Sequence, residues 1–496
     1  MTAAEVAGNA IELDFIHFND FSDTSTSSVE NTQRRRHASP ESRKRKRSPS
    51  PSSLFSSNII APWLTFDYPR QHDRPARILH HEIRDYVRYI QPTPNEHLLR
   101  GFVIYRVQHL VAKIWPGSET SVFGSFHTKL YLPSSDIDMV VFLPGENAGP
   151  VSKNVLYKLG TMLKTQNISH DVTVVAHARV PIVKFREKYT QIHVDISFNV
   201  DSGLKTAKTT RKFLNAYPGL KEIVVIVKSF LKQRDMNEVY QGGLGSYAIT
   251  LLSVSFLQRH PELSRGDILA KDNLGVLLIE FFELYGKLFA FDRIGIRVAP
   301  HDGQYFQKPP PLFSDRHRSG FTHSIFTPCI IDPEDDENDV GRGSYGILRV
   351  RQAFAQAYEI LTTMAYDLFK GKIAILNNVK QKQQGYTILS RILKVEASEV
   401  RRRKEWEERV IHEAEVKKAL PQVELMLLEM ERKDQGMDQD QLHSLAKMSS
   451  MKAVETKSKT PESVFKNSKS REPTETKKKK RKKKEKFVVD VHSDSD

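Results

Sequence analysis

The stretch "VFGSFHTKLYLPSSDIDMVVF" (Val122 to Phe142) decides the fold of this chain. It places two aspartates, Asp136 and Asp138, one residue apart at the start of an apolar run. Because side chains alternate along a strand, both carboxylates lie on one face, with Cα atoms about 6.5 to 7 Å apart. A buried strand does not begin with two carboxylates unless a cation offsets their charge. The stretch is therefore either a solvated strand entrance or half of a metal site.

A third carboxylate and a Gly-Ser pair favour the metal site. Asp195 lies between Val194 and Ile196 in the alternating run "HVDISF", where a charge without a partner is unfavourable. Carboxylate ligands indicate Mg²⁺ or Mn²⁺ rather than zinc, and two such ions about 3.5 to 4 Å apart serve phosphoryl transfer. Upstream, Gly124 permits close backbone approach, and the Ser125 hydroxyl with nearby N–H groups can hold a phosphate at a helix N-terminus.

Length and composition bound the class of protein. The chain has 496 residues and a formal charge of +15, with 75 Lys and Arg against 60 Asp and Glu. This length suggests two to three domains. The single cysteine, Cys329, excludes an intrachain disulfide framework and a multi-cysteine zinc site, and it fits a reducing compartment. No apolar run approaches the roughly 18 to 20 residues that span a bilayer, and the N-terminus lacks a signal-peptide pattern, so we expect a soluble intracellular protein without membrane contact.

The positive charge is concentrated near the two ends of the chain. "RRRHASPESRKRKRSPSPSS" lies near the N-terminus, and "KKKKRKKKEK" (Lys477 to Lys486) lies near the C-terminus. Such runs stay disordered and attract polyanions or import receptors. Two separate runs favour nuclear import, with nucleic-acid contact as a second use and a solubilising tail as the alternative.

The pattern of the chain between these runs predicts alternating structural types. Thr93, Pro94 and Glu96 form a complete helix start signal. Short β-branched runs follow from Ser121, with "REKYT" predicted as a hairpin turn, and helical periodicity returns after Leu204. "PCIIDPEDDENDVGRGSYGI" is predicted as an acidic, turn-rich loop. The predicted segments are a disordered tail at 1–61, helices at 62–120, a compact α/β unit at 121–204, a helical region at 205–375, and a charged helix with a basic tail at 376–496.

The combined pattern resembles the DNA-polymerase-β-type nucleotidyltransferase superfamily. The matching motifs are "VFGS", "SSDIDMVVF" and "VDISF". "IVKSFLKQRDMNEVYQGGLGSYAITLL", "LGVLLIEFFELYG" and "IIDPEDDENDVGRGSYGI" are similar to motifs of non-canonical poly(A) polymerases, especially the nuclear RNA-surveillance type found in the TRAMP complex. The resemblance, over roughly residues 62–375, implies an α+β fold. In it, a polymerase-β-like nucleotidyltransferase domain with a small mixed sheet is joined to a mainly helical, PAP-associated central domain with disordered basic tails.

The resemblance also implies a role for each matching residue. Asp136 and Asp138 would bind both metal ions, and Asp195 would join the ion that activates the RNA 3′-hydroxyl. The remaining matches would hold the incoming nucleotide, its phosphates by Gly124, Ser125, Lys228, Lys232 and Ser246, and its base by Tyr247, Asn338 and Asp339. Uridylyl-adding relatives carry a His where this chain has Asn338, which favours adenine. Thr206 lies where some relatives place a ribose-contacting Asn, and is a departure from the pattern.

Several of these residues have simpler interpretations. Lys228 and Lys232 are one helical turn apart and could be the solvated edge of an amphipathic helix. Tyr247 precedes an apolar run and could belong to the core. Asn338 and Asp339 could be ordinary turn residues.

We therefore expect a polynucleotide adenylyltransferase that adds AMP from ATP to RNA 3′ ends without a template, using two Mg²⁺ or Mn²⁺ ions. It would mark nuclear RNAs for processing or exosome decay, in the nucleus and with the nucleolus as one option. The resemblance implies two partners, a zinc-knuckle RNA-binding protein and an RNA helicase. The alternatives are a terminal uridylyltransferase or relaxed-specificity RNA nucleotidyltransferase, and an inactive RNA-binding scaffold.

Overall fold

The computed structural model describes residues 61–63, 74–145, 151–178, 180–300, 302–308, 325–370 and 387–435. Residues 1–427 form one compact unit, and residues 428–496 form a second, of which only 428–435 are described. The two basic runs and the predicted disordered tails lie outside the described residues. Within the described ranges, no helix is long and apolar enough to cross a membrane.

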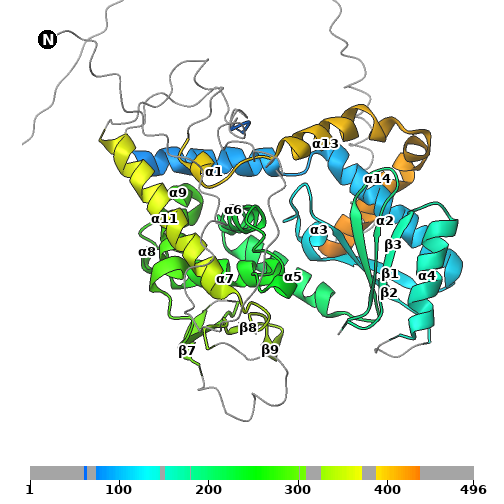
Figure 1. The fold of residues 1–496 in the computed structure, drawn as a ribbon, viewed down its shortest axis with the longest axis horizontal. Helices are drawn as coiled ribbons and strands as arrows, with labels where there is room; N and C mark the ends of the chain where they lie inside the picture. Colours follow the sequence, from blue (N-terminus) through cyan, green and yellow to red (C-terminus); the bar gives the residue numbers. More distant parts are fainter. Residues whose placement is uncertain are drawn as a thin grey trace, which may run out of the picture. The chain divides into compact units, whose positions relative to one another are not determined.

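A five-stranded mixed sheet carries the two neighbouring aspartates (Figure 1). Its strands are β1 Glu119–Phe123, β2 Ile137–Phe142, β3 Asp171–Val175, β4 Ile182–Arg186 and β5 His193–Phe198. Their order is β1-β2-β5-β4-β3, with β2 and β5 parallel and the other neighbours antiparallel. The run "DVTVVAHARVPIVKF" folds back on itself as β3 and β4. The predicted turn "REKYT" does join β4 to β5.

The helix that precedes the sheet begins as the sequence predicts. In α2 (Pro94–Ile114), the Glu96 N–H donates to Thr93 Oγ1 at 3.2 Å, and the Thr93 N–H donates to Glu96 Oε2 at 2.8 Å. This capping box satisfies two N–H groups that a helix start leaves unpaired. α2 packs against β1 and α4 (Lys153–Thr165), and α4 packs against β3 and β4 (Figure 1).

A second group of helices shares one hydrophobic core. Its longer members are α1 Pro75–Ile90, α5 Ser202–Ala216, α6 Leu220–Lys232, α7 Ser246–Arg259, α9 Leu274–Glu283 and α11 Ile347–Phe369. The shorter ones are α8 Pro261–Arg265, η4 Ala270–Asp272 and the π-helix η5 Leu284–Leu288. A further short helix, η3 Val239–Gln241, has no buried residue. Phe230, Phe282 and Phe354, from three different helices, lie with ring centroids 5.1 to 6.0 Å apart. These contacts fix α6, α9 and α11 against one another.

A smaller sheet corrects one prediction. Its strands are β6 Ile294–Arg297, β7 Gln304–Gln307, β8 Ile330–Asp332 and β9 Asp335–Asp339, in the order β7-β6-β8-β9. The acidic segment predicted as a loop is therefore a hairpin over β8 and β9. β9 consists of charged and polar residues at the exposed edge of the sheet, so its pairing with β8 rather than its residue preferences makes it a strand.

The charged C-terminal region folds back onto the rest of the unit. We call residues 387–412, which include η6 Leu389–Arg391, α13 Ala397–Glu408 and η7 Val410–His412, the C-terminal strap; α14 Ala414–Gln435 follows. The Ile388 and Leu389 N–H groups donate to the Glu82 carboxylate of α1 at 3.2 and 2.6 Å. Trp406, buried, donates from Nε1 to the carbonyl of Thr190, in the β4–β5 turn, at 3.1 Å. The strap thus contacts both α1 and the large sheet.

Candidate active site

Two of the predicted carboxylates occupy neighbouring positions in the large sheet. Asp138 on β2 and Asp195 on β5 are direct partners across the parallel strands. Both side chains therefore lie on the same face of the sheet. Asp136 lies one residue before β2, is exposed, and by alternation lies on that face as well. The fold therefore brings all three predicted carboxylates to the place where β2 begins.

The electrostatics of this group are unfavourable for the carboxylates alone. Burial raises the pKa of Asp138 to about 6, and the negative charges of Asp195 and Asp136 add to the shift. Burial also raises the pKa of Asp195, against the lowering effect of Lys184. A raised pKa means that the ionised form is destabilised in the fold. For Asp138, burial and the neighbouring carboxylates outweigh the stabilising effects of Lys184 and Lys228.

Lys184 was not among the site residues predicted from the sequence, but it lies within this group. It is the β4 partner of Asp195, and its Nζ forms an ion pair with Asp195 Oδ2. Burial acts to lower the pKa of Lys184, but the ion pair and the nearby Asp136 and Asp138 raise it above its ordinary value. A signal did exist, because Lys184 interrupts the apolar run "PIVKF" at an alternating position.

The donor set suits a hard divalent cation, because it consists of carboxylate oxygens with an excess of negative charge. As the side chains stand, no three His, Cys, Asp or Glu residues in the described ranges are grouped so that they could hold a metal ion. The Asp195 carboxylate is turned to the Lys184 ammonium. For Asp195 to become a ligand, its carboxylate has to exchange this ammonium for the ion.

Gly124 lies directly against the Asp138 carboxylate. Its φ is +63°, and a Cβ at this position would come within 2.3 Å of Asp138 Oδ2. Only glycine therefore fits between β1 and the carboxylate. Ser125 follows as the second residue of the short helix α3 (Gly124–Thr128) and is half-buried. Its carbonyl accepts from the Leu130 N–H at 3.1 Å and so fixes the loop that leads to the aspartates.

The two predicted lysines lie in different environments. Lys228 is buried, and its Nζ donates to the carbonyl of Leu130 at 2.7 Å. Burial, followed by repulsion from Lys232, lowers the pKa of Lys228 to about 8, whereas Asp138 acts to raise it. The interpretation of Lys228 as a solvated helix edge is therefore wrong. Lys232 is half-buried; burial lowers its pKa, and Glu399 and Asp136 oppose the shift.

Tyr247 and Asn338 meet at a buried carboxylate that the sequence did not single out. The Tyr247 hydroxyl donates to Asp332 Oδ1 at 2.9 Å, and Asn338 Nδ2 donates to Asp332 Oδ2 at 2.9 Å. Asp332 is 3% exposed and also accepts from the Glu334 N–H at 3.0 Å. Burial and the Asp332 charge raise the pKa of Tyr247 well above its ordinary value. Asp332 thus fixes the orientation of both predicted base-contacting side chains.

The remaining predicted residues, Asp339 and Ser246, and the departure at Thr206 make other contacts or are exposed. Asp339 Oδ1 accepts from the N–H groups of Ile330 and Gly341 at 2.8 and 2.9 Å, so its carboxylate holds the end of the hairpin as a turn residue does. Ser246 is exposed at the first position of α7. Thr206 Oγ1 donates within its own helix, to the carbonyl of Gly203 at 3.0 Å.

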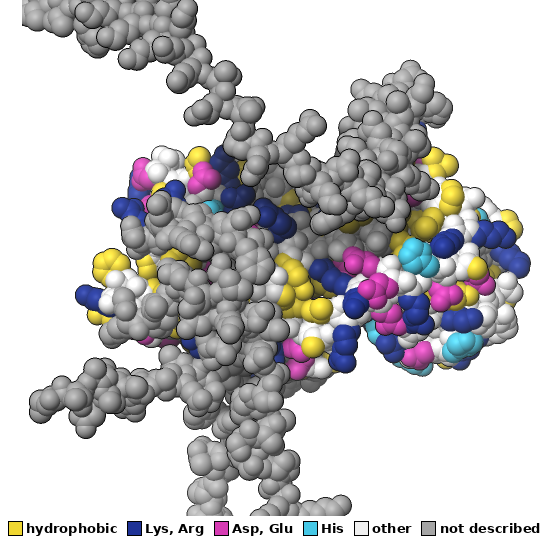
Figure 2. Space-filling view, turned by 90° about the horizontal axis from the view of Figure 1, so that it is seen from above, with side chains coloured by type: hydrophobic (Ala, Val, Ile, Leu, Met, Phe, Trp, Pro, Cys, Tyr) yellow, Lys and Arg dark blue, Asp and Glu magenta, His cyan; other side chains and the backbone are white. Residues whose placement is uncertain are grey.

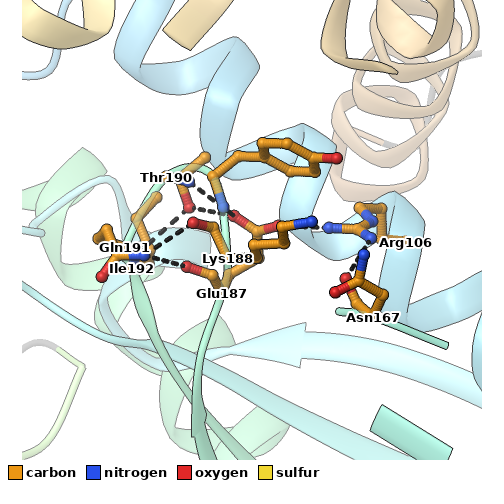
Figure 3. A network of polar contacts seen from close by, with 8 residues as sticks. Arg106, Asn167, Glu187, Lys188, Thr190, Gln191 and Ile192 are labelled. Carbon is orange, nitrogen blue, oxygen red and sulfur yellow. Dashed lines mark hydrogen bonds and ion pairs between the residues drawn. The ribbon is translucent and has the colours of Figure 1, made fainter. Parts of the chain in front are cut away.

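Two contacts relate the carboxylates to the rest of the unit. Helix α5 packs against α3 and β1, and its Thr209 hydroxyl donates to the Glu334 carboxylate between β8 and β9. Figure 3 shows the second contact, in which Glu187 forms an ion pair with Arg106 of α2 and accepts from the Thr190 N–H at 2.7 Å. Glu187 is fully buried, so this network ties the β4–β5 turn to α2 and fixes the strands that carry Lys184 and Asp195.

The mixed sheet with its paired aspartates, followed by the helical part, is a polymerase-β-like nucleotidyltransferase fold, as the sequence predicted. The family model described as "Poly(A) RNA polymerase, mitochondrial-like, central palm domain" matches residues 79–215. The model described as "Cid1 family poly A polymerase" matches residues 273–338. The first match contains the three carboxylates with Gly124 and Ser125, and the second contains Asn338. The remaining predicted site residues lie outside both matches: Lys228, Lys232, Ser246, Tyr247 and Asp339.

The chain belongs to the non-canonical poly(A) RNA polymerase family. It is similar to the solved polymerase core of TRAMP, an RNA surveillance complex, at 39% identity and a TM-score of 0.59, over 67% of this chain and 99% of that one. It is 43% identical to the poly(A) RNA polymerase cid14 of Schizosaccharomyces pombe, over 59% of this chain and 42% of that protein. It is also 36% identical to a Drosophila melanogaster member named as inactive, Trf4-2, over 66% of this chain and 79% of that protein.

These comparisons confirm the family but leave the activity to be tested. The chain spans 42 to 60% of the length of three poly(A) RNA polymerases that it matches. One relative is named as inactive, so membership alone does not establish catalysis.

Proposed function

We propose that the chain is a polynucleotide adenylyltransferase that adds AMP from ATP to RNA 3′ ends without a template. The observation that carries the proposal is the in-register pair Asp138 and Asp195, with Gly124 against the Asp138 carboxylate. This arrangement holds carboxylates close together in a buried place, which raises the pKa of Asp138 to about 6 although Lys184 and Lys228 oppose the shift. Membership of the poly(A) RNA polymerase family supports the same activity.

Asp136, Asp138 and Asp195 would hold two divalent ions, Mg²⁺ or Mn²⁺. When bound, such ions neutralise phosphate charge and lower the pKa of an attacking hydroxyl. The carboxylates orient the reacting groups, and the RNA 3′-oxygen displaces pyrophosphate from the α-phosphorus of ATP in line. Lys228 and Lys232 lie on the same helix beside this group and offset the charge of the triphosphate and of the leaving pyrophosphate.

The contacts of Asp332 with Asn338 and Tyr247 give a chemical reason for the selection of adenine over uracil. Asn338 Nδ2 donates to Asp332 Oδ2 at 2.9 Å, so the amide nitrogen of Asn338 is turned inward. The Asn338 Oδ1 is then left to accept from a base, and the exocyclic amine of adenine is a donor. Uracil presents a carbonyl oxygen at the equivalent position, which has no donor to face. Tyr247, held by the same carboxylate, stacks on the base.

We also propose that the reaction takes place in the nucleus, in a TRAMP-like complex with a zinc-knuckle protein and an RNA helicase. The similarity to the TRAMP polymerase core and the two basic runs support this part of the proposal. Figure 2 shows Lys and Arg side chains spread over the described surface of one face, among Asp and Glu side chains. Contacts of this kind would hold RNA with an affinity that salt weakens.

An extension assay tests the proposed function. A labelled short RNA is incubated with the full chain, with each of the four nucleoside triphosphates in turn, and with Mg²⁺ or Mn²⁺. We expect elongation with ATP, strongest of the four, and none without a divalent ion. Preference for UTP would make the chain a uridylyltransferase, and no elongation under any condition would contradict catalysis.

A further inference from the structure

A pocket of about 320 Å³ lies beside the segment that leads to the candidate aspartates, and Lys232 is part of its lining. Its walls come from α1, from α6, from residues 132–134 just before the aspartates, and from α13 of the C-terminal strap. Lys232 and Arg402 line it with positive charge, and Ser134 lines it with a hydroxyl. No residue of the C-terminal strap belongs to the matching motifs or to the predicted site.

Arg402 is the unusual member of this lining. Its Nε and Nη2 atoms are buried, and neither has a hydrogen-bond partner among the described residues. Burial lowers the pKa of Arg402, against the opposing effects of Glu399 and Glu96. Guanidinium N–H groups removed from water without acceptors are costly. Arg402 as a whole is half-buried and lines the pocket, so a turn of its guanidinium toward the pocket would let these groups donate to the anionic oxygen atoms of a ligand there, and phosphate matches the guanidinium fork best.

The neighbours of Arg402 hold it in place. Arg403 donates from Nη2 to the carbonyls of Ile90 and Gln91, each at 2.9 Å, and so fastens α13 to the end of α1. The Arg402 guanidinium carbon lies 5.3 Å from the centroid of the Trp406 ring, over a side chain that is itself buried. Arg402 is therefore oriented before any ligand binds, which reduces the entropy that binding loses.

Two carboxylates also line the pocket. Glu396 forms an ion pair with Lys394 at 3.4 Å, which offsets its charge. Glu399 Oε1 accepts from the Ser134 hydroxyl at 3.1 Å, and its charge acts on both Lys232 and Arg402. The negative charge of Glu399 would therefore repel a phosphate in the pocket. Removing this charge should strengthen phosphate binding, whereas removing the charge of Arg402 should weaken it.

We propose that this pocket is a phosphate subsite, in which Arg402 of the strap and Lys232 of α6 bind one phosphate group together. The inference rests on the proposed function, because it extends the triphosphate site past Lys232. Asp136 lies within electrostatic reach of Lys232, which favours the distal phosphates of the nucleotide or the leaving pyrophosphate. A phosphodiester of the RNA has the same chemistry, and the two sources are separated by experiment.

The direct test is calorimetric titration of the full chain with inorganic pyrophosphate. We expect Arg402→Gln to weaken binding about tenfold or more, the loss typical of one charge-assisted hydrogen bond. Glu399→Gln is expected to tighten binding, a gain that misfolding cannot produce. Arg401→Gln is the matched control, because Arg401 is the exposed preceding residue and does not line the pocket; it should bind as the wild type does. Equal affinities for the Arg402 and Arg401 variants would overturn the proposal.

Extension kinetics then assign the source of the phosphate. A raised KM for ATP in Arg402→Gln, with the KM for RNA unchanged, supports the nucleotide. A raised KM for RNA alone supports a phosphodiester in the same pocket. If the wild type and Arg401→Gln bind pyrophosphate but extend no RNA, the proposed function fails while the subsite stands. Arg402→Lys, which keeps the charge, serves as a second variant if Arg402→Gln unfolds.

Discussion

Burial and the charges of two neighbouring carboxylates, Asp195 and Asp136, raise the pKa of Asp138. Gly124 leaves room for the Asp138 carboxylate, because a Cβ at position 124 would come within 2.3 Å of Asp138 Oδ2. Such an arrangement lowers the stability of the isolated fold, because like charges are held together in a partly buried place. Functional sites commonly store this kind of strain. The residues around Asp138 are therefore expected to trade activity against stability.

Gly124→Ala tests the close approach to Asp138. The new methyl group would overlap Asp138 Oδ2, so we expect the carboxylate to move and RNA extension to fall about a hundredfold. Gly266→Ala is the matched control, because Gly266 also has a positive φ, +78°, but open space around it. Both variants should lose about 1 to 2 kcal/mol of stability to backbone strain, and only Gly124→Ala should lose activity. Similar activity in both would contradict the role of Gly124.

Asn338→His tests the orientation imposed by Asp332. An imidazole at this position can donate to the carbonyl of uracil, so we expect the use of UTP relative to ATP to rise about tenfold. The measurement is the ratio of kcat/KM for the two nucleotides. Glu337→His, at the exposed preceding residue, should leave the ratio unchanged. An unchanged ratio in Asn338→His would count against the base-recognition role of the hairpin.

Site residues that form a local sequence pattern could be predicted from the sequence, whereas those identified only by a distant partner could not. Alternation was enough to place Asp136 and Asp138 on one face, and the resemblance of the motifs added Asp195. Lys184 and Asp332 were not predicted as site residues. Strand register brings Lys184 to Asp195, and a short hairpin brings Asp332 to Tyr247 and Asn338. Neither pairing follows from periodicity, which reports only the face of an element and not its neighbour.

At the scale of elements, the strap is held by side chains that satisfy the ends of helices. Arg403 donates to three carbonyls at the end of α1, those of Tyr89, Ile90 and Gln91. Its Nε also donates, at 2.9 Å, to Glu96 of the α2 capping box. One arginine therefore joins α13 to the C-terminus of α1 and to the N-terminus of α2. The charged pattern of this region predicted helix but gave no sign of this contact.

Arg403→Ala is expected to destabilise the chain strongly. Glu96 is nearly fully buried, so removing Arg403 leaves it without its cation, and we expect a loss of about 3 to 5 kcal/mol. The measurement is the free energy of unfolding in urea. Arg409→Ala breaks only an exposed ion pair with Glu405 and should cost about 0.5 kcal/mol or less. Equal losses in the two variants would show that the strap is not fastened through Arg403.

The junction between α1 and the strap is expected to respond to pH. Burial raises the pKa of Glu82 to about 7, although the Leu389 and Ile388 N–H groups act to lower it. The protonated carboxyl is thus favoured in the fold. Its stabilising contribution is fully present below the unfolded pKa of 4.5 and is lost as the pH rises through about 7. The full change is on the order of 3 kcal/mol.

The check is the pH dependence of the free energy of unfolding in wild type and Glu82→Gln. Between pH 4.5 and 7, the wild type should lose stability relative to this variant, which does not titrate. Parallel curves for the two proteins would contradict the assignment of Glu82.

At the scale of the whole molecule, the candidate site draws on segments that only the intact fold brings together. The carboxylates lie in the large sheet, the lysines lie on α6, and the base-contacting pair lies on α7 and β9. The motifs indicated which segments take part, and the comparisons confirm the family and fold that they implied. The domain limits at 120, 204 and 375 stay predictions. So does the nuclear role of the basic runs, which lie outside the described residues.

The central claim is that the paired carboxylates catalyse adenylyl transfer, and Asp138→Asn tests it most directly. The change keeps the shape of the side chain but removes its charge. We predict that extension of a short RNA with ATP falls roughly a thousandfold, because several kcal/mol of charge stabilisation are lost. The melting temperature should stay the same or rise, since repulsion from Asp195 and Asp136 is relieved. Asp171→Asn, at an exposed carboxylate of the same sheet, should retain full activity. Wild-type extension by Asp138→Asn would contradict the account.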